Sequence, residues 1–193
     1  MLMAKASSSD KVGAAITRTV ESKEKVSAGG VFTVQCIGAD GQVKWQESLK
    51  NLVVNQGLQD MNTKYFKGSA YTAAWYIGLY GAAASNDPTA ADTAASHPGF
   101  TEIVPYSNAT RPAATFGTAT TADPSVISNS ASPAVYTINS TSTVGGAFLI
   151  SDNTKSGTAG VLFSASDFAA PGDRAVSNGD TINITYTFSL DAA

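Results

Sequence analysis

Few side chains in this sequence are suited to acid–base, nucleophilic or metal chemistry. His97 is the only histidine, and it lies in a Ser-His-Pro-Gly stretch with no second ligand at a helix or strand spacing. A catalytic triad or an imidazole metal site would have to use it. We therefore expect His97 to be a turn or interface residue without a catalytic role.

The single cysteine, Cys36, lies in an alternating run on the same side as Phe32 and Val34. One cysteine cannot form an intrachain disulfide, so the fold does not depend on oxidation. A position on the apolar side of a strand favours a small buried hydrophobic residue over a reactive thiol.

The acidic residues are scattered singly, and aspartates in the loops of β-proteins usually cap turns. Two of them could still meet in space as a glycosidase pair, which the sequence does not decide. Trp45 and Trp75 lie in strand-like runs, whereas a sugar-cleaving cleft normally exposes several aromatic residues. The isolated acids include Asp40, Glu47, Asp87, Glu102, Asp152, Asp167, Asp173 and Asp180.

Motifs for cofactors and nucleic acids are also missing from the sequence. The Gly-rich stretches lack the framing of a phosphate-binding loop, and Asp152-Asn153-Thr154 lacks the remaining ligands of an EF-hand. Lysine and arginine form no cluster. We predict no enzyme activity, no catalytic, cofactor-binding or metal-binding residues, no cofactor and no nucleic-acid partner.

The clearest structural element is the run DTINITYTFSL, residues 180–190. Apolar residues occupy every second position, and Thr, Asn and Ser fill the positions between them. This period of two predicts a strand with one apolar face, which must be covered by a second sheet. The apolar residues are Ile182, Ile184, Tyr186, Phe188 and Leu190.

Short strand-like runs separated by Gly and Pro recur along the rest of the chain. The Asp40-Gly41 turn predicts a hairpin, and Pro105 indicates either a sheet edge or a bulge. A second hairpin with a long polar turn is expected around residues 151–160. Further strands are expected at residues 72–81, 99–107, 109–119, 124–130 and 133–140.

One helix is predicted at residues 56–66, from the spacing of Leu58, Met61 and Tyr65, and Gly68 would end it. Residues 81–98 form a long loop of small residues, which is usually functional or in contact with a partner. The fold class is therefore all-β, an antiparallel β-sandwich or jelly roll with one short helix.

Length and charge also limit the number of domains and the kinds of partner that we expect. The 193 residues suit one domain with a substantial core. Residues 1–67 carry nine of the 12 basic residues, whereas residues 68–193 carry nine of the 15 acids. This asymmetry suggests either a docking side and a solvent side or ordinary surface charge. No apolar run has the length of a signal peptide or a membrane span, so we expect synthesis in a reducing cytoplasm and no membrane partner.

Residues 1–29 are polar and mixed in charge, with only scattered apolar residues such as Ile16, Val20 and Val26. Such a segment cannot bury enough apolar surface to offset its own ordering. It is predicted to be an extended N-terminal arm that contacts other chains, preceding a β-sandwich domain at residues 30–193.

Several phrases of the sequence are distinctive, namely GGVFTVQCIGADGQVKWQESLKNLVVNQGL, TAAWYIGLY, SHPGFTEIVPYSNATRPA, STVGGAFLISDNTKSGTAG and NGDTINITYTFSL. Together they resemble a family of virion structural proteins of tailed bacteriophages. The resemblance implies a capsid decoration (cement) protein on the outer surface of the head. Its expected partners are the major capsid protein and neighbouring copies of itself, as a dimer or trimer.

Two other functions fit the same composition. One is a phage tail, fibre or adaptor subunit involved in host attachment, with exposed aromatic loops. The other is a carbohydrate-binding or carbohydrate-cleaving β-sandwich.

Overall fold

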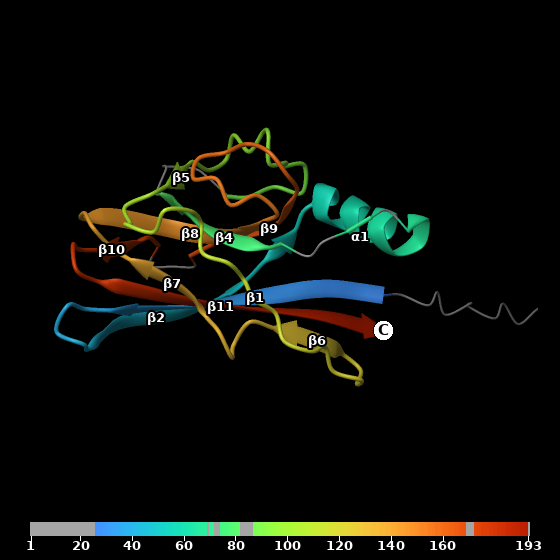
Figure 1. Ribbon diagram of the computed structural model, residues 1–193, viewed down its shortest axis with the longest axis horizontal. Helices are drawn as coiled ribbons and strands as arrows, with labels where there is room; N and C mark the ends of the chain where they lie inside the picture. Colours follow the sequence, from blue (N-terminus) through green and yellow to red (C-terminus); the bar gives the residue numbers. More distant parts are fainter. Residues whose placement is uncertain (1–25, 69, 72–73, 82–86, 169–171, 193) are drawn as a thin grey trace, which may run out of the picture.

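The computed structural model describes residues 26–68, 70–71, 74–81, 87–168 and 172–192. They form two β-sheets and the helix α1 (Asn55–Lys67), which lies at one end of the molecule (Figure 1). One sheet, named sheet A, contains β1 (Val26–Ile37), β2 (Val43–Lys50), β6 (Ser125–Ser128), β7 (Ala134–Thr137) and β11 (Thr181–Ala192). The other, sheet B, contains β3 (Leu52–Val53), β4 (Tyr76–Gly81), β5 (Glu102–Ile103), β8 (Ser142–Ile150), β9 (Leu162–Asp167) and β10 (Arg174–Val176).

Every strand pairing in the two sheets is antiparallel. Sheet A has the order β2-β1-β11-β6, with β7 also pairing with β11. Sheet B has the order β3-β9-β8-β4-β5, with β10 pairing with β8. The predicted all-β sandwich with one helix is confirmed, whereas this strand order does not confirm a jelly roll.

The longest pairing joins β1 and β11, in register from Val26 opposite Ala192 to Ile37 opposite Thr181. The predicted alternation of β11 is confirmed, because Ile182 and Ile184 are fully buried. On the neighbouring strand, Phe32, Val34 and Cys36 point into the same core. Together, β1 and β11 present the apolar face of sheet A on which sheet B packs.

Local signals also predicted several other regular elements, although not the short strand β10. The predicted hairpin at Asp40-Gly41 joins β1 to β2, and a second hairpin joins β8 to β9. The predicted helix is confirmed as α1, and Gly68 follows it in the left-handed conformation at φ 61°. β5 is an edge strand of sheet B, as Pro105 indicated.

The prediction of a strand at residues 109–119 was wrong. This segment makes only an isolated bridge between Ala113 and Tyr76 of β4. Its backbone hydrogen bonds to this part of the chain are those of the Pro112 carbonyl with the Ile77 amide and of the Ala114 amide with the Trp75 carbonyl, and Pro112 has no amide hydrogen with which to extend the ladder.

β1 begins at Val26, so residues 26–29 of the predicted arm belong to sheet A, and residues 1–25 lie outside the described residues. Gly81, the first residue of the loop predicted at residues 81–98, is the last residue of β4, and the rest of this loop is described from Asp87 onward. There Ala94 is buried, and its amide donates to the Gln56 side chain of α1.

A buried polar node joins the two sheets where the chain crosses between them. The Tyr186 hydroxyl of β11 accepts hydrogen bonds from Asn51 Nδ2 at 2.7 Å and from Ser164 Oγ of β9 at 3.2 Å. Asn51 lies between β2 and β3, and its backbone N–H donates to the Gly30 carbonyl at 2.9 Å. A Cβ on Gly30 would lie 2.7 Å from the Tyr186 hydroxyl, so glycine is required beside the node.

We predict that Tyr186→Phe lowers the free energy of unfolding by about 1–3 kcal/mol, because the substitution leaves two buried donors without an acceptor. Chemical denaturation would measure the loss. The control is Tyr65→Phe on α1, where the ring is 83% exposed and no change is expected. An unchanged midpoint for Tyr186→Phe would show that the node does not stabilise the sandwich.

Candidate functional site

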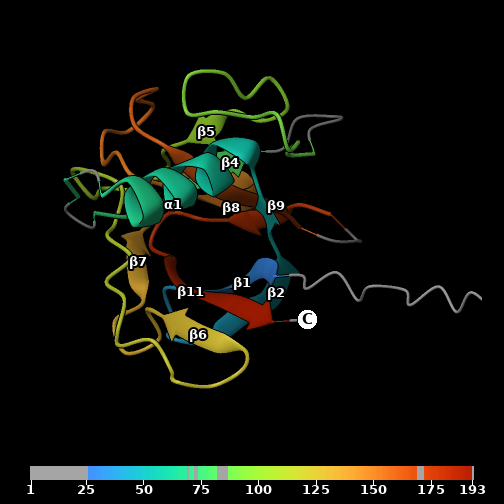
Figure 2. The same ribbon diagram turned by 90° about the vertical axis from the view of Figure 1, so that its right-hand side faces the viewer.

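An apolar groove of about 850 Å³ is lined by residues of α1 and of the outer ends of β1, β6 and β11. Figure 2 shows the arrangement of these elements, with α1 and β6 belonging to opposite layers of the sandwich. The floor of the groove is the inner face of sheet A, formed by Val26, Ile127, Phe188 and Leu190. Period-two alternation gives these residues the same orientation as the buried core residues of their strands. They are nevertheless incompletely covered, and Val26 is 72% exposed.

The roof is the second half of α1. The start of the helix is fixed by Gln56, whose Oε1 accepts from the amides of Ala94 at 3.0 Å and Leu162 at 2.8 Å. One residue later, a Cβ on Gly57 would lie 2.5 Å from the Phe163 carbonyl oxygen, so glycine allows the helix to approach β9 closely.

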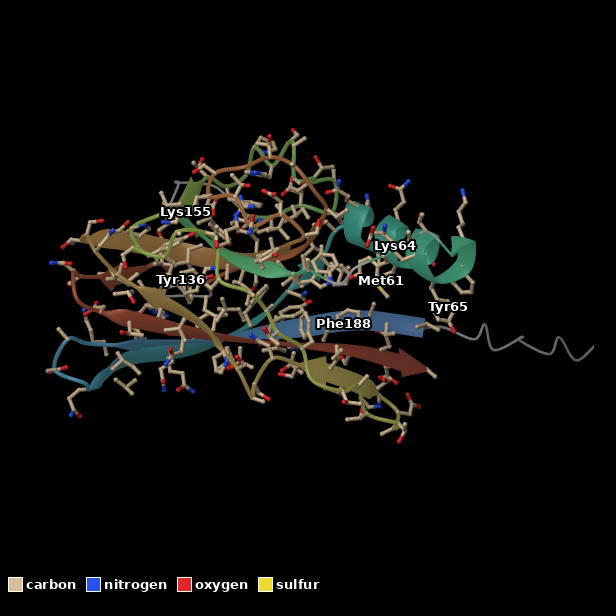
Figure 3. The ribbon with its side chains drawn as sticks, in the orientation of Figure 1. Met61, Lys64, Tyr65, Tyr136, Lys155 and Phe188 are labelled. Carbon is tan, nitrogen blue, oxygen red and sulfur yellow. The ribbon has the colours of Figure 1, made fainter. Side chains whose placement is uncertain are left out.

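The last turns of α1 extend past sheet B and carry apolar side chains over the groove. Met61 packs against the core, and Tyr65 is 83% and Phe66 76% exposed. Figure 3 shows Met61 and Tyr65 on the side of the helix that faces the strands, above Phe188. The Tyr65 and Phe66 rings contact each other edge to face at 4.9 Å. The rim of the groove is therefore aromatic.

Aromatic rings also build the inner wall. Phe163 lies 5.4 Å from the Trp75 ring and 5.3 Å from the Phe188 ring, both edge to face. Trp75 Nε1 donates to the Tyr71 hydroxyl at 2.7 Å, which fixes the indole. These interlocked rings make the wall a preformed surface.

The side chains that line this groove are mainly aromatic and aliphatic. Asp60, Asn62 and Lys64 are the polar side chains among the lining residues that border solvent along α1. A sugar site needs several converging donors and acceptors, and a catalytic site needs positioned titratable groups. A cleft lined mainly by aromatic and aliphatic side chains instead suits an apolar stripe of a polypeptide.

Sequence reasoning did not identify this groove. The expectation for β11 was an apolar face covered along its whole length. The available signal was the length of that run: its alternation continues through Phe188 and Leu190, beyond the reach of the shorter strands of sheet B.

The structure places Cys36 in the core, as expected, and next to Asp180. Its thiol donates to Asp180 Oδ2 at 3.7 Å, and Lys44 Nζ lies 2.6 Å from the same oxygen. Burial and the adjacent carboxylate raise the pKa of Cys36 to about 11. Burial alone would raise the pKa of Asp180, but hydrogen bonds from Lys44 and the Ser177 amide outweigh it, and the pKa lies below its ordinary value.

His97 lies in a turn, where its ring stacks on Phe100 at 4.4 Å and its Nδ1 is 2.9 Å from the Phe100 carbonyl oxygen.

Of the isolated acids, Asp167 accepts a hydrogen bond from the Tyr80 hydroxyl at 3.1 Å. Burial raises the pKa of Asp167. Across the described ranges, no group of three or more His, Cys, Asp or Glu side chains could hold a metal ion.

Two acids of the sequence, Glu102 and Asp152, are brought together by a buried arginine that sequence reasoning missed. Arg111 is 2% exposed, and its Nε and Nη2 donate to the two Glu102 carboxylate oxygens at 2.9 and 2.8 Å. Its Nη1 and Nη2 also donate to the carbonyls of Asp152 and Gly157 at 2.7 and 2.9 Å. This centre fixes the long turn between β8 and β9, and every guanidinium nitrogen in it already has a protein acceptor.

No helix within the described residues has the length and apolar character needed to cross a membrane. Comparisons with protein-family models, curated proteins and solved structures find no match to this chain.

We predict that the Cys36 thiol of the folded protein does not react with a maleimide at pH 7.5, because it is buried and its pKa is raised to about 11. Labelling should appear only when denaturant unfolds the chain. Ser27→Cys, at an exposed position on the same strand, should react at once and serves as the control. Rapid labelling of Cys36 in the folded state would contradict a buried thiol.

We predict that Arg111→Met lowers the free energy of unfolding by about 3–5 kcal/mol, because it leaves the buried Glu102 carboxylate without its partner. Thermal unfolding should show a loss of roughly 10 °C in Tm. Lys50→Met at an exposed position of β2 removes the same charge and should leave Tm nearly unchanged. Equal behaviour of the two variants would rule out a structural ion-pair centre at Arg111.

Proposed function

We propose that this protein is a capsid decoration (cement) protein of a tailed bacteriophage, located on the virion, which binds the outside of the head and stabilises contacts between major capsid subunits. The observation that carries this proposal is the apolar groove at the open end of the sandwich. The resemblance of the strand and loop phrases to phage virion structural proteins supplies the context.

The size and character of the exposed apolar surface support a role in protein contacts. Val26, Tyr65 and Phe66 are each more than 70% exposed and belong to one continuous groove. Soluble proteins rarely leave such patches open unless they bind a partner. Aromatic residues in particular dominate the energetics of protein interfaces.

The mechanism of a cement protein is mechanical. A standard interface buries about 1,600 Å² in total, which is enough for specific binding of one copy. Because the contact would be repeated at every equivalent position of the capsid, even modest individual contacts add up to a large resistance to internal DNA pressure. The body needs a rigid contact surface for this role, and the interlocked rings of the groove wall provide one.

The second candidate is a tail, fibre or adaptor subunit. The aromatic rim at Tyr65 and Phe66 favours it, together with Tyr71, which is 49% exposed. Copy number separates the two roles, since decoration requires hundreds of copies per particle and a tail component requires a few to a few dozen, as rough orders. The small number of polar groups in the groove disfavours the carbohydrate-binding alternative.

We predict that Tyr65→Ser combined with Phe66→Ser weakens binding to undecorated capsids by about 10- to 100-fold, in line with the loss of interface hot-spot residues. Co-sedimentation with purified heads would measure the affinity. The matched control is Val43→Ser with Val135→Ser, which removes exposed apolar side chains away from the groove and should bind normally.

Two results would contradict this view. If both double variants bound equally, the groove would not be the capsid contact. If the unaltered protein did not bind undecorated heads, the decoration role itself would be wrong.

A further inference from the structure

The described part of the chain begins at the floor of the groove. Val26 is the first residue of β1 and also lines the floor. β2 pairs with β1 only from Val31 onward, so residues 26–30 are paired with β11 alone among the described strands. Twenty-five residues precede Val26 in the sequence. They are therefore attached directly beside an uncovered apolar surface.

Three of the scattered apolar residues of this N-terminal segment share a spacing of four. Val12, Ile16 and Val20 recur at intervals of four, and Ala15 and Thr19 flank them. Residues four apart lie on the same face of a helix, so a helix over this stretch would have a narrow apolar stripe. Binding of such a stripe in a hydrophobic groove is a standard mode of peptide recognition.

The link between the stripe and β1 is short and polar. Residues 21–25 read Glu-Ser-Lys-Glu-Lys and contain no Gly, Pro, Asn or Asp. Five residues span at most about 17 Å when extended. A hinge that is short and poor in turn-forming residues opposes folding back on the same chain and favours exchange with a neighbouring copy.

We propose that residues 12–20 of one copy bind the groove of a second copy, so that two copies exchange their N-terminal segments reciprocally. Val12, Ile16 and Val20 would cover the floor at Phe188 and Leu190 beneath the aromatic rim. This inference rests on the proposed function in one respect, namely that the groove binds protein: the exchanged segment would occupy the floor, whereas the rim at Tyr65 and Phe66 would remain exposed for the contact with the capsid. It names that segment and the kind of partner.

The first test measures oligomeric state and contact together, with the full-length chain and without capsids. Light scattering should give the mass of a dimer. A mixture of Ile16→Cys protein with Leu190→Cys protein should form a disulfide between the two different copies under mild oxidation. Thr17→Cys, one position off the stripe, should couple at least tenfold less with the same partner. The natural Cys36 is buried and does not interfere.

Two surface variants and one insertion sharpen the test. Val26→Asp should dissociate the dimer at least tenfold more readily than Ser27→Asp, which adds the same charge at an exposed position with the opposite orientation on the strand. Inserting six Gly-Ser residues between Ser22 and Lys23 should produce monomers, because the longer hinge allows the segment to reach its own groove.

Two outcomes would overturn the proposed exchange of segments. A monomer in which Ile16→Cys and Leu190→Cys of one chain couple would mean that the segment fills its own groove. If neither arrangement forms the disulfide, and deletion of residues 1–25 leaves the mass unchanged, the segment does not occupy the groove. Failure of exchange with normal binding to heads leaves the decoration proposal standing, and intact exchange without binding to heads overturns only that proposal.

Discussion

The antiparallel ladder between β1 and β11 is the constraint on which the rest of this structure depends. It runs in register from Val26 to Ile37, whereas the strands of sheet B opposite to it are shorter. A strand keeps its apolar side chains on one face along its whole length. Sheet A therefore presents apolar residues beyond the point where sheet B ends, and α1 covers them only in part. The groove is a direct consequence of this difference in length.

Two buried polar centres hold the surfaces around the groove in place. The node at Tyr186 fixes the distance between the sheets at the inner end, where β9 and the crossover at Asn51 meet β11. Arg111 fixes the turn between β8 and β9, the strand on which α1 packs. Every guanidinium nitrogen of Arg111 has an acceptor within the protein, and the Tyr186 hydroxyl accepts from two side chains, whereas Asn51 Oδ1 is buried without a hydrogen-bond partner among the described residues. Both centres hold the surfaces that border the groove in place, and a preformed surface has a smaller ordering cost if it binds a partner.

Most of the fold could be predicted because its signals are local. The alternation of β11, the Asp40-Gly41 hairpin and the helix that ends at Gly68 each depend on a few neighbouring residues. The groove depends on the relative lengths of strands from different sheets, which no local pattern reports. Arg111 was missed for a related reason: its acceptors come from two separate parts of the chain, strand β5 and the turn between β8 and β9, and its own segment was predicted to be a strand.

An incompletely covered core is a way to couple stability to assembly. Any segment that binds the folded groove and not the unfolded chain stabilises the fold in proportion to its free concentration. Under the proposed exchange, each copy supplies the missing cover of its neighbour, so the complete core exists only in the assembled form. Copies placed side by side on a capsid would have high effective concentrations of both segment and groove. The same exposed rim that is a liability for a lone molecule would then favour the lattice over the free protein.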